Sequence, residues 1–380
     1  MKPVPLVYTE VGNQGVREVD CVLRSGKLRE GSVGKRLETA FAEHTGAPHA
    51  VALDSGTAAL QLALQAHGVT SGDEVVIPSL CLPPVAAAVV SSGAQPVFAD
   101  VDPYTYTIAP EEVSRVITER TRAVVAVHLF GQPCDMDRLS AIAQAHDIVL
   151  IEVVWDALGA RYRDRRVGSH GTSCYSFPQG GHIAGSDGGM LTTNDERVAR
   201  EVRCMANCGC DERGRMHQTG YSYLMSEVSA TIALEHLPRV DSHARLQEYW
   251  AMELTHELKD WDGLVTPAVL PGARHAFQRY AVRVSPTFPM TPSTVCEQLD
   301  AHGIESVCRP ITPLHRHPLF RLDLDPEEAD RLSNSDRVAS EMVLLPMHPY
   351  LEQEQVQRIA DALGMMATYV PEGDYTLDPE

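Results

Sequence analysis

Residues 47–68, APHAVALDSGTAALQLALQAHG, contain the pattern that decides the fold. The apolar run 47–55 ends in Asp-Ser and fits a strand of a parallel sheet. From Ser55 the sequence changes to small residues and leucines at helical spacing, and this pattern ends at Gly68. A strand that leads at once into a capped helix is the repeating unit of α/β proteins.

The same alternation continues along the chain. Further strands are predicted at 72–80, 95–102, 121–131 and 148–154, with helices at 81–93, 110–118 and 135–147 between them. These strands are apolar on both faces, as expected for a mostly parallel sheet that helices cover on both sides. We place a domain boundary in the helical stretch 241–259, giving a large domain, 1–245, and a smaller α+β domain, 246–380, in which 274–285 is a strand.

Composition excludes several classes of partner. The chain has 380 residues, of which 44% are hydrophobic and 22% are charged, and its net charge is -19. Nucleic acids and anionic membranes select basic surfaces, so we expect neither as a partner. The N-terminal residues MKPVPLVYTE lack an apolar signal core, and no apolar run approaches the ~20 residues of a spanning helix. We therefore expect a cytoplasmic protein that binds a small molecule.

Cysteine usage favours reduced thiols. The nine cysteines are an odd number scattered along a chain that has no secretion signal. Only Cys204, Cys208 and Cys210 cluster, with His217 seven residues further on. The spacing C-x3-C-x-C is not a standard zinc pattern, so chance clustering is favoured over a metal or iron–sulfur site.

The carboxyl ends of the predicted strands should form one pocket. In open α/β sheets ligands bind beyond these ends, which here are 55–57, 80–82, 128–130, 153–156 and 176–181. Ser55, Gly56 and Thr57 lie at a strand-to-helix turn, where backbone amides and the helix N-terminus attract an anion. Trp155 could offer a stacking surface to a ligand, although burial in the core is the simpler interpretation.

Lysine is scarce in a way that limits the chemistry. The only lysines are Lys2, Lys27, Lys35 and Lys259, so none lies in the segments that form the predicted pocket. A Schiff-base enzyme needs a primary amine in its pocket. Arginine cannot replace it, because the guanidinium group stays protonated.

Ordered segments along nearly the whole chain resemble the DegT/StrS-type sugar aminotransferases, a family of pyridoxal-phosphate (PLP) enzymes. The matching segments include DSGTAALQLAL (54–64), GDEVVIPSL (72–80), VHLFGQPCDMDRLSAIAQAH (127–146), GYSYLMSEVSATIALEHL (220–237) and RPITPLHRHPLF (309–320). The resemblance implies an aspartate-aminotransferase-like fold with a sheet of the seven-stranded type, and a homodimer with pockets at the subunit interface. The segment EVVWDALG (152–159) looks closest to the branch that dehydrates keto-deoxysugar nucleotides, in which histidine replaces the lysine.

The resemblance assigns roles to single positions. Ser176 corresponds to a second phosphate ligand beside Ser55, Gly56 and Thr57, and further ligand contacts are expected from Gln179, Gly181, Ser222 and His315. Three positions lack the residue that the cofactor needs: Leu82 replaces the stacking aromatic, Val153 the carboxylate that pairs with the pyridinium nitrogen, and Gly181 the lysine. Counting forward from Val153 instead places His182 at the lysine position.

These losses lead to the functional expectation. We expect no cofactor, and PLP in particular is not expected, because its anchor, stacking partner and electron sink are all missing. The chain is then a repurposed enzyme of aminosugar or natural-product biosynthesis that uses His182 and Asp156 for acid–base or group-transfer chemistry. The substrate would be a small molecule, phosphorylated or linked to a nucleotide. Two alternatives stay open: a non-catalytic partner of an active homologue, and a PLP- or PMP-dependent dehydratase or aminotransferase in which His182 replaces the lysine.

Overall fold

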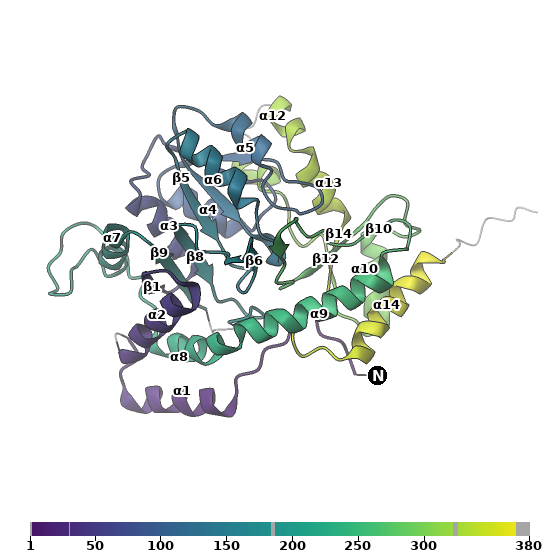
Figure 1. Cartoon of the computed structure of the whole chain (residues 1–380), viewed down its shortest axis with the longest axis horizontal. Coiled ribbons are helices and arrows are strands. Elements are labelled where there is room, and N and C mark those ends of the chain that lie inside the picture. The colour runs from purple at the N-terminus through teal and green to yellow at the C-terminus, as the bar shows by residue number, and fades with distance from the viewer. Residues whose placement is uncertain (1, 30, 184–186, 322–325, 370–380) are drawn as a thin grey trace, which may run out of the picture.

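The computed structural model describes residues 2–29, 31–183, 187–321 and 326–369 of the chain (Figure 1). Its centre is a seven-stranded sheet in the order β1-β9-β8-β5-β4-β2-β3. The seven-stranded type of sheet expected from the sequence is confirmed. The strands are β1 (His49–Leu53), β2 (Glu74–Pro78), β3 (Gln95–Ala99), β4 (Thr121–Val127), β5 (Val149–Val153), β8 (Thr172–Ser176) and β9 (Gly189–Thr193).

Strand β9 is the exception in this sheet. It pairs antiparallel with both β8 and β1, whereas β2, β3, β4, β5 and β8 pair parallel to one another. Strands β8 and β9 follow each other without a crossover helix, and such direct neighbours pair antiparallel. The expectation of a parallel strand at 47–55 is therefore half right: β1 runs in the direction of the parallel strands, but its neighbour in the sheet, β9, is antiparallel to it.

Helices cover both faces of the sheet because its strands are apolar on both faces. One face packs Val75, Ile77 and Val125 against α3 (Gly56–Ala66), α4 (Pro83–Ser91) and α7 (Glu196–Ala206). The other packs Val76 and Val124 against α5 (Pro110–Val116) and α6 (Met136–Ala145). Burying both faces excludes water from the strands and leaves the carboxyl ends of the strands as the place for a ligand.

Three helices lie together at one side of the sheet, beyond β1 (Figure 1). They are α1 (Asn13–Ser25), α2 (Ser32–Thr45) and α8 (Glu227–His236), which is followed by the 3-10 turn η2 (Leu237–Arg239). The Glu227 side chain, buried at the start of α8, accepts hydrogen bonds from the amides of Val33 and Gly34, each at 2.9 Å. This carboxylate caps the first turn of α2 and fixes α2 against α8.

The long helix α9 (Val240–Leu258) leads from these helices to a second sheet (Figure 1). That sheet is antiparallel in the order β10-β12-β14-β13, and α10 and α14 pack beside it in one apolar core with the C-terminal half of α9. The predicted domain boundary at residue 245 falls within α9 and stays a prediction. The elements are β10 (Leu264–Val265), β12 (Tyr280–Val284), β13 (Val307–Cys308), β14 (Met342–Leu345), α10 (Pro292–Ala301) and α14 (Gln353–Ala367).

Two polar contacts join the C-terminal region to the carboxyl ends of the central strands. Asp100, directly after β3, accepts hydrogen bonds from the amides of Asn334 and Ser335 at 3.0 and 2.8 Å, at the start of α13. Ser79, directly after β2, lies 2.6 Å from His315 Nδ1. The remaining elements are β6 (Arg161–Tyr162), β7 (Arg165–Arg166), β11 (Ala273–Arg274), η1 (Leu129–Gly131), η3 (Leu314–Arg316), α11 (Pro318–Arg321), α12 (Pro326–Arg331) and α13 (Ser333–Glu341).

The residues described include no helix that is both long and apolar enough to span a membrane.

Candidate active site

Three of the predicted strand-end segments meet at Gly56. A methyl group built on Gly56 would lie 2.6 Å from Ser176 Cβ, at the end of β8, and 2.6 Å from Trp155 Nε1, in the segment after β5. Only glycine leaves room for this approach. The sequence predicted that these segments converge, and the structure places them side by side.

The first turn of α3 presents open backbone amides. Ser55 caps the helix, because its hydroxyl accepts a hydrogen bond from Ala58 N at 3.1 Å and lies 3.1 Å from Asp54 Oδ1. The first intrahelical hydrogen bond is that of Ala59 N to Ser55 O, so the amides of Gly56 and Thr57 precede the helical ladder. Two open amides at the positive end of the helix dipole attract a phosphate group.

Gly189 brings α3 close to the sheet. A methyl group at this position would lie 2.4 Å from the carbonyl carbon of Ser55 and 2.6 Å from Gly56 N. Gly189 is the first residue of β9 and pairs with both Leu53 and Ser176. The glycine-rich stretch 176–189 therefore supplies close backbone contact at its end. Residues 184–186 of that stretch lie outside the described residues.

Asp156 is a buried carboxylate on the strand-end segment. Its Oδ1 accepts a hydrogen bond from Gln278 Nε2 at 3.2 Å, and the residue is 8% exposed. Burial raises the pKa of Asp156, and the Arg279 guanidinium partly opposes this shift. A methyl group on Gly181 would lie 3.2 Å from Pro178 O and 3.3 Å from the same Gln278 Nε2, so Gly181 lies beside the residue that holds Asp156.

His182 faces the other way. Its Nδ1 lies 2.6 Å from Leu158 O, and its Nε2 contacts Gln247 Oε1 in α9. Gln247 Nε2 donates to the carbonyls of Phe277 and Met347, which fixes the orientation of that amide. Burial lowers the pKa of His182 despite these hydrogen bonds. In this arrangement both ring nitrogens of His182 are engaged within the chain. Of the two residues allowed by the register, Gly181 lies beside Gln278.

Val153 and Leu82 are apolar residues packed in the core near the candidate site. Val153 is fully buried in the core below the site, and Leu82 packs at the start of α4 beside the buried Cys81. The carboxylate before Val153 is used elsewhere, because Glu152 binds His128 Nε2 at 3.1 Å and the amides of Gly168 and His170 at 2.8 Å each. Glu152 therefore anchors structure around the site.

The other expected ligand residues lie at separate places. Gln179 is exposed in the turn after β8. Ser222 Oγ accepts a hydrogen bond from Arg29 at 3.0 Å within the same chain. His315 is 1% exposed and lies between Ser79 and Asp336, whose Oδ1 is 3.3 Å from His315 Nε2. His315 therefore joins η3 and α13 to the end of β2.

The cysteine cluster does not form a recognisable metal site. Among the described residues no group of three or more His, Cys, Asp or Glu side chains has the arrangement to hold a metal ion. His217 Nε2 lies 2.9 Å from Asp211 Oδ2, and Cys210 Sγ lies 3.9 Å from Cys208 O.

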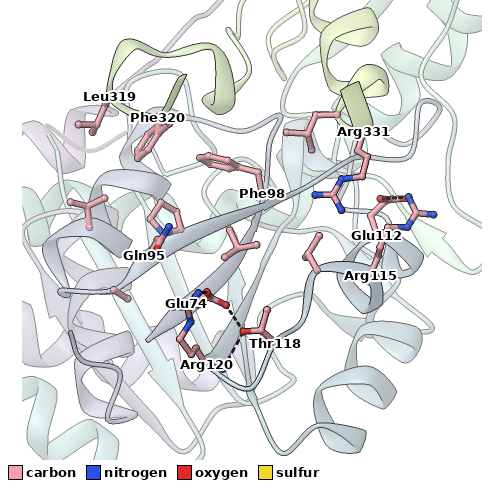
Figure 2. Close-up of a pocket in the computed structure, with 16 residues that line it drawn as sticks. Glu74, Gln95, Phe98, Glu112, Arg115, Thr118, Arg120, Leu319, Phe320 and Arg331 are labelled. Carbon is pink, nitrogen blue, oxygen red and sulfur yellow. Dashed lines mark hydrogen bonds and ion pairs between the residues drawn. The ribbon is translucent and has the colours of Figure 1, made fainter. Parts of the chain in front are cut away.

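A cleft of about 650 Å³ lies along the edge strand β3 (Figure 2). Its lining runs from Glu74 and Gln95, at the amino ends of β2 and β3, to Phe98 near the carboxyl end of β3. Its aromatic wall is Phe98 edge-to-face with Phe320 at 5.3 Å. Glu74 is used within this wall, because Thr118 Oγ1 donates to it at 2.5 Å and Arg120 pairs with it. This cleft is distinct from the site at Gly56.

Comparisons with known proteins define the class of the chain. Its fold matches the crystal structure of S. venezuelae DesV in complex with a ketimine intermediate, with a TM-score of 0.92 and 30% identity over 97% of this chain and 100% of that one. An aminotransferase of Psychrobacter cryohalolentis matches with a TM-score of 0.89 and 28% identity, over 95% of this chain and 98% of that one. The fold is thus the aspartate-aminotransferase-like α/β fold of sugar aminotransferases.

Sequence comparison then gives the family. Residues 10–364 match the DegT/DnrJ/EryC1/StrS aminotransferase family, and the chain belongs to it. The GDP-perosamine synthase of Caulobacter vibrioides is 37% identical over 88% of this chain and 91% of its own length. The dTDP-3-amino-3,4,6-trideoxy-alpha-D-glucose transaminase of Streptomyces venezuelae is 31% identical over 96% and 94%. The resemblance seen in the sequence is confirmed, as is a place among the proteins of aminosugar biosynthesis.

The expectation that no cofactor is used, PLP least of all, is wrong. The family is one of aminotransferases, and its members matched here are named as amino-sugar synthases and transaminases. Such enzymes carry the amino group on PLP, so PLP is the cofactor that family membership supports. The missing lysine, stacking aromatic and pyridinium partner do not exclude the cofactor, because its phosphate can be held by other residues.

The residues present fit the phosphate group of PLP. Gly56 and Thr57 offer amides, Ser176 lies against Gly56, and Trp155 Nε1 points there without a hydrogen-bond partner among the described residues. The residues for the ring differ from the expected pattern, because Val153 is apolar and Gly181 has no side chain. Holding the cofactor through its phosphate is the function that these residues can perform.

Sequence reasoning missed two residues that shape the site: Gln278 holds Asp156, and Gly189 admits the start of α3. Trp155 was considered only as a stacking surface, and the structure places its Nε1 beside Gly56. Gln278 lies 122 residues from Asp156 in sequence, and no local pattern could have revealed the contact.

Proposed function

We propose that this chain is an enzyme of aminosugar biosynthesis that binds PLP or PMP without a covalent link and acts on a nucleotide-linked sugar. The observation that carries the proposal is the phosphate site at Gly56 and Thr57 in a pocket that has no lysine from its own chain. When bound, the cofactor supplies the electron sink and carries the amino group. The family and the named relatives support the substrate class.

Asp156 is the residue proposed to move a proton. It is buried, burial raises its pKa, and Gln278 holds its Oδ1, so the carboxyl group is oriented and can exist in either protonation state. His182 is proposed as a positioning residue. By bonding Leu158 O and Gln247, it fixes the loop so that Gly181, which has no side chain, lies beside Gln278.

Cofactor binding can be tested without knowing the substrate. The purified protein is mixed with PLP or PMP and separated from free cofactor by gel filtration. The protein should retain the cofactor, and after borohydride treatment and denaturation the chain should carry no added mass, because no lysine links it. A protein that emerges free of either cofactor would overturn the proposal. A stable adduct would contradict the non-covalent part.

Amino transfer can be tested in the reverse direction with the amino sugars in the relatives' names. GDP-perosamine or dTDP-3-amino-3,4,6-trideoxy-α-D-glucose is added to the PLP-loaded protein, and loss of the PLP absorbance band reports transfer of the amino group to the cofactor. Asp156→Asn should retain the cofactor but lose this conversion, because the amide keeps the shape of the carboxyl group without its acid–base capacity. Conversion at the parental rate in Asp156→Asn would exclude the proposed role of Asp156.

A further inference from the structure

Trp155 is a buried residue with an unused hydrogen-bond donor. It is 7% exposed, and its Nε1 has no hydrogen-bond partner among the residues described. A buried donor without a partner costs the protein about 1–3 kcal/mol. Such groups are rare in folded proteins and call for a ligand or water to complete them.

The unused donor points at the start of α3. Of the indole atoms, Nε1 is nearest to a methyl group built on Gly56, at 2.6 Å, and Cε2 follows at 2.9 Å. The Nε1 side of the indole ring therefore lies closest to the helix N-terminus. The same Gly56 amide and that of Thr57 precede the helical ladder. Three N–H groups thus gather at one place.

The chemistry of these groups selects one kind of ligand. The indole N–H and the two amides are donors that cannot accept a hydrogen bond. An oxyanion that offers several acceptor oxygens matches them, and the helix dipole adds a favourable potential for negative charge. The nearest carboxylate on this turn, Asp54, accepts a hydrogen bond from Ser55 Oγ at 3.1 Å, and burial raises its pKa.

We propose that Trp155 is a phosphate-binding residue whose indole N–H donates to a phosphate oxygen held at the N-terminus of α3. This proposal rests on the function proposed above, because that function supplies the ligand that carries the phosphate. Both the phosphate of PLP and the diphosphate of a sugar nucleotide present the same acceptor oxygens. Trp155 then supplies a contact that compensates for the missing covalent anchor.

The first experiment uses Trp155 as its own reporter. The chain has three tryptophans, and the double variant W250F/W261F leaves Trp155 as the only one. Its emission is measured during titration with inorganic phosphate, with PLP, and with pyridoxal, which lacks the phosphate. Phosphate and PLP should shift or quench the emission, whereas pyridoxal should have little effect. Unchanged emission at saturating phosphate and PLP would overturn the proposal.

The second experiment removes only the donor. W155F keeps an aromatic ring but has no N–H, and W250F is the matched control, because Trp250 Nε1 is also buried and without a partner but lies in α9. By calorimetry W155F should bind inorganic phosphate and PLP about tenfold more weakly, as expected for one hydrogen bond to a charged group. W250F should bind as the parent does. Equal affinities of W155F and W250F would refute the role of Trp155.

These experiments distinguish the two possible sources of the phosphate, the cofactor and the sugar nucleotide. They also test the role of Trp155 separately from the proposed function. A tenfold loss for PLP assigns the site to the cofactor, and a loss for GDP or dTDP alone assigns it to the sugar nucleotide. Failure to bind PLP together with Trp155-dependent phosphate binding would overturn the proposed function and leave this inference standing. If a folded W155F binds PLP, phosphate and nucleotide as the parent does, the inference about Trp155 is overturned and the proposed function stands.

Discussion

Replacing Glu152 with glutamine should destabilise the protein strongly, because this buried carboxylate satisfies four donors. It is 1% exposed and accepts from the amides of Gly168 and His170 at 2.8 Å each, from His128 Nε2 at 3.1 Å and from Ser173 Oγ at 3.3 Å. Glutamine has nearly the same shape, but one of its oxygens becomes an NH2 group. Whichever oxygen is replaced, at least one backbone N–H then faces a donor.

The magnitude follows from these contacts. A hydrogen bond to a charged group contributes ~1.5–3 kcal/mol, and the variant loses about two of them. We therefore expect E152Q to lower the free energy of unfolding by about 3–5 kcal/mol. Urea unfolding followed by circular dichroism measures this change. Glu111→Gln is the control, because Glu111 pairs with Arg138 at the surface, where such a pair contributes about 0–1 kcal/mol.

The pH dependence gives a second check. Burial alone would raise the pKa of Glu152, but hydrogen bonds from His128 and His170 hold it well below its ordinary value of 4.5. A depressed carboxyl pKa contributes stability that is present in full above the unfolded pKa and is lost as pH falls through the folded one. The difference between parent and E152Q should stay constant from pH 8 to about 5.5 and shrink in more acidic solution. A difference under about 1 kcal/mol at pH 7.5, or one that vanishes between pH 8 and 6, would refute the reasoning.

Three further outcomes are expected. Gly189→Ala should lower the unfolding midpoint and weaken phosphate binding, because its methyl group would overlap the Ser55 backbone; an unchanged midpoint and an unchanged phosphate affinity would argue against this. Asp100→Asn should cost about 1–3 kcal/mol in urea unfolding, since Ser335 N and Oγ lose a charged acceptor. Burial lowers the pKa of His275 to about 3, so stability should fall as pH drops below ~6.5, by at most ~1.4 kcal/mol per pH unit for this group; a flat profile from pH 7.5 to 5 would contradict it.

The local pattern of the sequence determined the strands and helices of the large domain. The apolar runs, the serine before α3 and the glycine after it predicted the strands and helices of the large sheet, because each depends on neighbouring residues. The open amides at Gly56 and Thr57 followed from the same pattern, since a helix N-terminus has such amides wherever it occurs. Family membership was also readable, from ordered segments along the whole chain.

Side-chain direction in the loops was decided by the tertiary structure. The sequence could not show that His182 contacts Gln247, 65 residues away, or that Gly181 lies beside Gln278. Nor could it show that Nε1 is the indole atom of Trp155 nearest to Gly56. A loop side chain turns toward whichever distant partner satisfies it, and only the packed chain brings those partners together.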